Sequence, residues 1–130
     1  MTGSTIKNLK EVEDAAPGFG LSPDLEARFA RDPLECEQMG FSYQRLAPNF
    51  RTPFGHKHNT QEEVYVIVSG GGRVKLDDEV RDIGQWDAVR VAPGTMRNFE
   101  AGPEGLELIA FGAPKTPPGD AEMVQGWWSD

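Results

Sequence analysis

The sequence has very little cysteine and no long hydrophobic run. Cys36 is the only cysteine among 130 residues, so an intrachain disulfide is excluded. No apolar stretch approaches the roughly 20 residues that a membrane-spanning helix needs. Residues 1–18 are mostly polar and charged, unlike a secretory signal peptide. We therefore expect a soluble, cytoplasmic protein that does not cross a membrane.

Basic residues are also scarce. Lys and Arg number 13 against 21 Asp and Glu, which gives a formal net charge of −8. A surface this negative repels the phosphate backbone of nucleic acids and the headgroups of anionic lipids. We therefore do not expect nucleic acids or membrane surfaces as partners.

Glycine and proline, in contrast, are abundant, at 15 and 10 residues. This composition favours many short strands joined by turns. We divide the chain into an N-terminal extension (1–37), a strand-rich domain (38–114) and a C-terminal tail (115–130). One short helix is predicted over 23–31, with Ser22 as its cap and Pro23 at its first position. In the tail, Trp127 and Trp128 are expected to pack on the domain or on a partner.

The middle region contains only strand signals. A run of three glycines after Ser69 is interpreted as a turn, and no helical pattern separates the strands, so a parallel sheet with crossover helices is not expected. Short strands with closely spaced turns indicate a β-sandwich or barrel. The predicted strands cover residues 41–46, 64–68, 73–76, 80–83, 86–92, 97–100 and 106–111.

Both histidines of the chain lie in one segment, at His56 and His58. A spacing of two residues on a strand directs both imidazoles to the same face. Glu63 opens the following strand and brings a carboxylate near them. Two imidazoles and one carboxylate suit a divalent Fe, Mn, Ni, Cu or Zn ion. From spacing alone, two ordinary surface histidines are an equally good interpretation.

The segment resembles the first sequence motif of the cupin superfamily: His56, one residue, His58, four residues, Glu63, six residues and Gly70. Residues 84–97 resemble the second cupin motif, and the resemblance covers roughly residues 40–113. It implies an all-β fold, a cupin jelly-roll barrel, here with the short N-terminal helical extension. It also implies a homodimer, since cupins often dimerise.

The second motif departs from the family pattern at one position. Arg97 stands where cupins usually have a fourth metal-binding histidine, and an arginine has no lone pair to donate to a metal. Two arrangements fit this change. In one, His56, His58 and Glu63 hold the metal and Arg97 binds an anionic substrate. In the other, Arg97 pairs with Glu63 in place of the metal.

Three further residues are candidates for binding a small-molecule ligand. Alternation places Tyr65 on the face of Glu63 and Phe99 on the face of Arg97, and Gln44 lies on the first strand of the domain. Core packing is the competing interpretation for each. Three functions are consistent with the sequence: a metal-assisted oxygenase or isomerase acting on a small anionic metabolite, a metal-free ligand-binding or sensing module, and a barrel that serves only as a scaffold for dimerisation.

Overall fold

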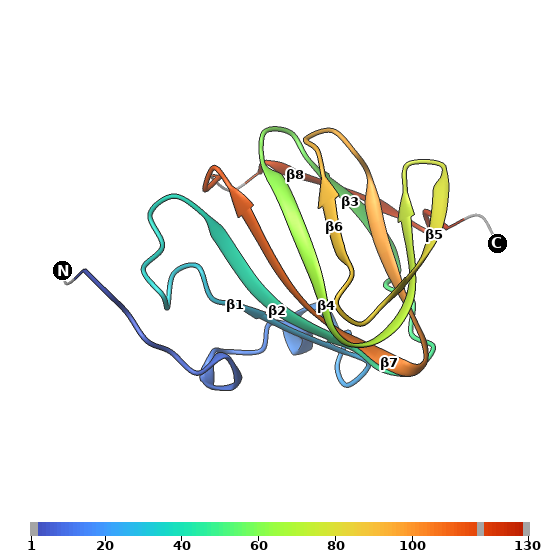
Figure 1. Cartoon of the computed structure of the whole chain (residues 1–130), viewed down its shortest axis with the longest axis horizontal. Helices are drawn as coiled ribbons and strands as arrows, with labels where there is room; N and C mark the ends of the chain where they lie inside the picture. Colours follow the sequence, from blue (N-terminus) through green and yellow to red (C-terminus); the bar gives the residue numbers. More distant parts are fainter. Residues whose placement is uncertain (1–2, 117–118, 129–130) are drawn as a thin grey trace.

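The computed structural model describes residues 3–116 and 119–128. It consists of eight strands in a single sheet, which curls into a half-open barrel (Figure 1). All strand pairs are antiparallel, with the order β1-β2-β7-β3-β8, and β4 pairs with β5, β6 and β7. The strands are β1 (Leu25–Phe29), β2 (Gly40–Leu46), β3 (Phe54–His58), β4 (Glu62–Leu76), β5 (Glu79–Gly84), β6 (Ala88–Val91), β7 (Arg97–Ala113) and β8 (Ala121–Gln125). The predicted all-β barrel class is confirmed.

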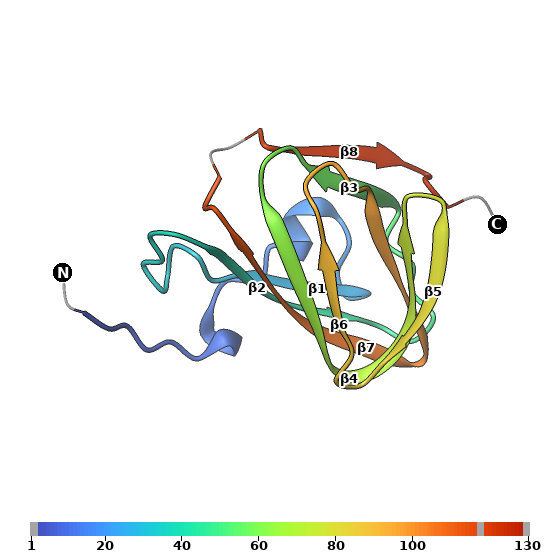
Figure 2. The ribbon, with the colours of Figure 1, turned by 45° about the horizontal axis from the view of Figure 1, so that its top comes forward.

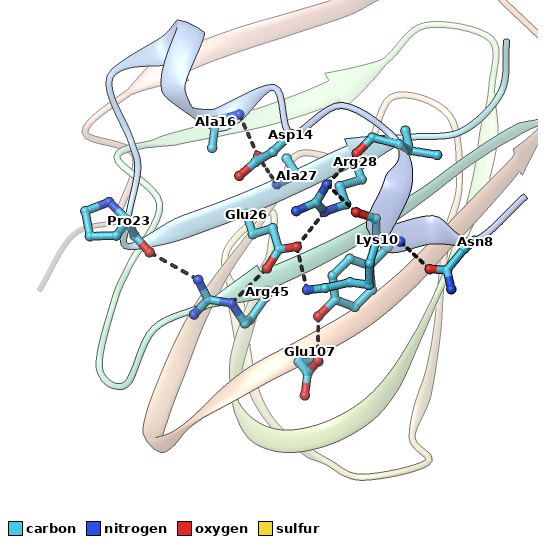
Figure 3. A network of polar contacts seen from close by, with 12 residues as sticks. Asn8, Lys10, Asp14, Ala16, Pro23, Glu26, Ala27, Arg28, Arg45 and Glu107 are labelled. Atoms are coloured by element: carbon cyan, nitrogen blue, oxygen red, sulfur yellow. Dashed lines mark hydrogen bonds and ion pairs between the residues drawn. The ribbon is translucent and has the colours of Figure 1, made fainter. Parts of the chain in front are cut away.

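The helix predicted over 23–31 is wrong. Its central residues form β1, which pairs antiparallel with β2 from Leu25 opposite Leu46 to Phe29 opposite Ser42. Side chains alternate along β1. Leu25 and Ala27 face the inside of the barrel, whereas Glu26 lies on the outer face of the sheet and binds basic side chains (Figure 3). This pairing overrides the local helix-start signals, because helix propensity is weak compared with tertiary contacts. Helical structure is limited to two short 3-10 turns, η1 (Leu9–Glu11) and η2 (Ala16–Phe19).

The glycine run after Ser69 is not a turn, contrary to the sequence interpretation. The 15-residue strand β4 continues through it, with register shifts against β7 between Ile67 and Ser69 and between Gly70 and Gly72. A Cβ atom on Gly72 would lie 2.0 Å from the carbonyl oxygen of Glu100. The glycines therefore allow β4 and β7 to approach closely where the sheet bends.

Side chains alternate between the inner and outer faces of the barrel, and Tyr65 shares the face of Glu63 as expected from the sequence. On β4, Tyr65 and Ile67 are buried and share the inner side with Glu63, while Glu62 is exposed on the outside. Ile67 belongs to one buried hydrophobic cluster with residues of β2 and β7, such as Leu46 and Leu108. No helix in the described part of the chain is long and apolar enough to cross a membrane.

Strand β8 has no counterpart among the predicted strands. It pairs with β3, from Phe54 opposite Gln125 to His58 opposite Ala121, and Figure 2 shows it running along β3 at the top of the view. Beyond it, the ring of Trp127 lies against Gly55, where an added Cβ would be 2.5 Å from the indole. The C-terminal segment thus joins the sheet beside the two histidines.

Candidate metal and ligand site

The structure brings His56, His58 and Glu63 together. The two histidines project from β3 and Glu63 from the start of β4, and one ligand atom from each lies within 4.8 Å of the others. The imidazole rings are perpendicular, with centroids 5.3 Å apart. The His-x-His spacing therefore places both rings beside one carboxylate, as alternation along a strand requires.

The carboxylate of Glu63 has three close neighbours. The Tyr65 hydroxyl donates a hydrogen bond to Oε1, His58 Nε2 lies 3.8 Å from that atom, and Arg97 Nη2 lies 3.9 Å from it. Burial, followed by the charge of Glu63, raises the pKa of Tyr65 well above its usual value. Tyr65 therefore keeps its proton and holds one oxygen of Glu63 in place.

Arg97 is completely buried behind this group. Its Nη1 donates to the backbone oxygen of His56 at 3.4 Å, while Nε and Nη2 make no hydrogen bond to the residues that the structure describes. At 3.9 Å its contact with Glu63 is a loose ion pair, longer than a hydrogen bond. Arg97 is not among the residues that line the neighbouring cavity, so the guanidinium stands behind the candidate ligands.

The environment of His56 keeps its imidazole neutral. Burial, then the positive charge of Arg97, then His58 lower its pKa from 6.5 to about 3. A neutral imidazole has a free lone pair on one ring nitrogen. At neutral pH, His56 is therefore in the protonation state that metal binding requires.

Asp120 lies beside His58, a position that was not predicted from the sequence. Its Oδ2 is 3.3 Å from His58 Nδ1. Partial burial raises the pKa of Asp120, but hydrogen bonds from Thr60 and the proximity of His58 outweigh this and lower it below its usual value. No local pattern marks Asp120, because its position depends on the pairing of β8 with β3.

A cavity of about 710 Å³ adjoins the three candidate ligands. The predicted ligand-binding residues Tyr65, Phe99 and Gln44 all line it, and the rings of Tyr65 and Phe99 are 4.7 Å apart. Most other lining residues are apolar. They include Leu21, Leu25, Ala27, Phe41, Leu46, Phe54, Ala110 and, at the exposed margin, Phe19, Phe29 and Met123.

The donor set fits a divalent transition metal. It offers two imidazoles from β3 and a carboxylate from β4, and His56 is neutral. Nδ1 of His58 is directed to the carboxylate of Asp120, which leaves Nε2 toward Glu63. Metal-binding histidines usually direct their second ring nitrogen to such a group. The buried positive charge of Arg97 repels a cation at this site. The argument for a metal therefore depends on the geometry of the three donor residues.

Comparison with known sequences gives limited information. No protein-family model matches the chain. An uncharacterized protein of Methanocaldococcus jannaschii is 31% identical over 71 residues, which are 54% of this chain. The match spans 57% of the length of that relative, so the similarity covers little more than half of either protein.

Solved structures match nearly the whole chain. A cupin protein from Bacteroides fragilis has a TM-score of 0.72 and 20% identity, covering 98% of this chain and 93% of its own. The Streptomyces protein Pac13, described as a nucleoside dehydratase, has a TM-score of 0.74 and 16% identity, covering 94% and 92%. KdgF from Halomonas has a TM-score of 0.69 and 18% identity, covering 88% and 96%. Together with the motif around His56, His58 and Glu63, these matches identify the fold of this chain as that of the cupin superfamily.

Proposed function

We propose that this protein is a cupin that acts on a small molecule, with one divalent transition metal held by His56, His58 and Glu63. The observation that carries the proposal is the convergence of these three donors at the wall of a cavity large enough for a small metabolite. Two histidines and one carboxylate leave coordination positions open for substrate or oxygen, as in non-haem iron oxygenases. A metal-assisted oxygenase or isomerase is the reaction class we propose.

A bound metal would act as a Lewis acid that polarises a substrate oxygen. The chain's own residues support it from several sides. Tyr65 donates a hydrogen bond to one carboxylate oxygen of Glu63, and Asp120 lies beside Nδ1 of His58, the ring nitrogen directed away from Glu63. The apolar side chains of the cavity would displace water around a bound ligand, which strengthens electrostatic interactions there.

The cavity lining narrows the class of ligand. Among the described lining residues, Arg31 is the only lysine or arginine, and it is already engaged by Asp32 and by the backbone oxygen of Thr116. We therefore propose a ligand with an apolar or aromatic body and an oxygen-bearing end directed at the metal. The metal would balance the charge of a carboxylate on that end. Arg97 would not, because it is buried behind His56, His58 and Glu63 and does not line the cavity.

A metal-free binding or sensing module is the second candidate, and the position of Arg97 favours it. Its guanidinium is fully buried and its Nη2 lies 3.9 Å from Glu63. A unit positive charge about 5 Å from a divalent ion costs about 7 kcal/mol at an effective dielectric of ~20, as an upper bound. Metal binding therefore requires that the three ligands outweigh this repulsion.

The test is the metal content of protein purified without a metal-affinity step, measured by plasma mass spectrometry. We expect close to one transition-metal ion per chain, lost in His56→Ala and retained in the control Lys57→Ala on the same strand. No metal, even after incubation with Fe, Mn, Ni and Zn, would overturn the proposal. Arg97→His separates the two candidates further: a sharp rise in affinity means that the arginine excludes metal in the natural protein, whereas an unchanged affinity means that three ligands suffice.

A further inference from the structure

The C-terminal segment 119–128 contributes to the site, although it lies far from the histidines in sequence. We propose that Asp120 is a positioning residue that fixes the imidazole of His58, and that Trp127 and Trp128 anchor the segment so that Asp120 stays in place. The consequence for metal affinity rests on the proposed function. The orientation of His58 does not, because it is a property of the metal-free protein.

The contact between Asp120 and His58 is specific. Asp120 Oδ2 and His58 Nδ1 are 3.3 Å apart, both are buried, and neither makes a hydrogen bond to another described residue. The other carboxylate oxygen, Oδ1, accepts two hydrogen bonds from Thr60, from the backbone N–H at 3.1 Å and from the hydroxyl at 2.9 Å. The carboxylate is therefore fixed on one side by Thr60 and directs its second oxygen to the imidazole.

This arrangement selects one tautomer of His58. An ionised carboxylate can only accept, so the proton of a neutral His58 belongs on Nδ1. Nε2 then carries the lone pair, and it is the nitrogen that lies 3.8 Å from Glu63 Oε1. Asp120 therefore directs the lone pair of His58 to the point that the candidate metal ligands share.

Strand β8, which follows Asp120, is weakly held by itself. Its five residues are all exposed, and β3 is its only strand partner in the described chain. Elements with few buried contacts open readily. The position of Asp120 therefore depends on what fixes the segment beyond β8.

The two tryptophans supply that anchor. The Trp127 ring lies on Gly55, so closely that an added Cβ would be 2.5 Å away, and Lys75 Nζ donates to its backbone oxygen at 2.8 Å. The Lys75 ammonium is also 4.4 Å from the centre of the Trp127 ring. The guanidinium groups of Arg51 and Arg73 lie 4.3 and 5.2 Å from the Trp128 ring. Stacking and cation–π contacts thus hold the end of the chain beside β3.

The first test compares Asp120→Asn with the control Glu122→Gln on the same segment. In Asp120→Asn, Thr60 still needs an acceptor, so the amide NH₂ turns to His58 and favours the proton on Nε2. We expect ¹⁵N NMR of the metal-free protein to show His58 changing from the Nδ1–H to the Nε2–H tautomer, and Co²⁺ affinity to fall roughly 10- to 100-fold. Glu122→Gln should leave both unchanged. An unchanged His58 tautomer in Asp120→Asn overturns the proposal.

The second test loosens the anchor without altering the site. Trp127→Ala should give the same direction of change at His58 and faster hydrogen exchange of the β8 amides, whereas Trp86→Ala, which removes a tryptophan that is 69% exposed, should not. An unchanged His58 spectrum in Trp127→Ala refutes the anchoring role. If the natural protein binds no Co²⁺ while His58 responds as expected, the metal site fails and the positioning role of Asp120 stands.

Discussion

At the scale of single residues, Glu26 concentrates charge on the outer face of the sheet. It is only 7% exposed and accepts from Lys10 Nζ at 2.6 Å, Arg28 Nε at 2.5 Å and Arg45 Nε at 3.1 Å. Burial alone raises the pKa of Glu26, but these hydrogen bonds outweigh it and lower the pKa from 4.5 to about 2. Glu26 therefore ties the N-terminal segment to β1 and β2 as an ionised group (Figure 3).

We expect Glu26→Gln to lower the free energy of unfolding at pH 7 by about 1–3 kcal/mol. Because the folded-state pKa is depressed, the contribution of Glu26 is present above pH 4.5 and is lost as the pH falls toward about 2. Urea unfolding at pH 7 and at low pH measures this, and the difference between wild type and variant should shrink on acidification. Glu79→Gln, which breaks an exposed pair with Arg81, is the control and should change stability by less than about 0.5 kcal/mol. A difference for Glu26→Gln that persists at low pH contradicts this account.

At the scale of secondary-structure elements, the bend in β4 depends on glycine. At Gly72, a Cβ would meet the Glu100 carbonyl oxygen at 2.0 Å and the Gly102 nitrogen at 2.9 Å, and both obstacles are backbone atoms of β7. Backbone atoms held in a ladder cannot move aside as the end of a flexible side chain can. The two longest strands therefore need glycine where they cross the bend.

Gly72→Ala should therefore destabilise the protein by about 1–3 kcal/mol or more, since overpacking displaces the neighbouring strand. Gly84→Ala is the matched control on β5, because a Cβ there meets nothing within 4 Å. Thermal and urea unfolding measure the stability of the two variants. Equal stability of Gly72→Ala and Gly84→Ala would be incompatible with a close approach of β4 and β7 at this point.

At the scale of the whole molecule, exposed apolar side chains gather at the cavity margin. Phe19, Phe29 and Met123 are 61%, 52% and 61% exposed, and all three line the cavity. A ligand with an apolar body would cover part of this surface, so its exposure does not by itself require a second subunit. The homodimer that the family resemblance implies stays a prediction.

A substitution on one side of β8 tests the cavity as an apolar site. Met123→Glu places a charge in the lining and should weaken binding of the neutral dye Nile red to metal-free protein by about tenfold, or 1.4 kcal/mol. Val124→Glu is the control, because Val124 is the next residue of the strand, is 43% exposed and does not line the cavity. Fluorescence titration measures both affinities. Equal losses in the two variants would mean that the dye binds elsewhere or responds only to net charge.

Much of the fold could be predicted where the local pattern and the tertiary pairing agree. Alternation correctly placed Tyr65 on the inner face with Glu63, and the His-x-His spacing correctly brought His56 and His58 beside Glu63. The helix over 23–31 is wrong because Ser22 and Pro23 mark a helix start, whereas pairing with β2 determines the conformation. The turn predicted at the three glycines after Ser69 is wrong because glycine suits a bulged strand as well as a tight turn.

The class of fold and the three candidate metal ligands follow from the sequence, because strand alternation and motif spacing are local properties of the chain. Two features exist only in the folded chain: Arg97 lies behind these ligands without lining the cavity, and Asp120 reaches His58. Both facts depend on how β7 and β8 pair with β3, and pairing between distant strands leaves no signal in the residues near either one.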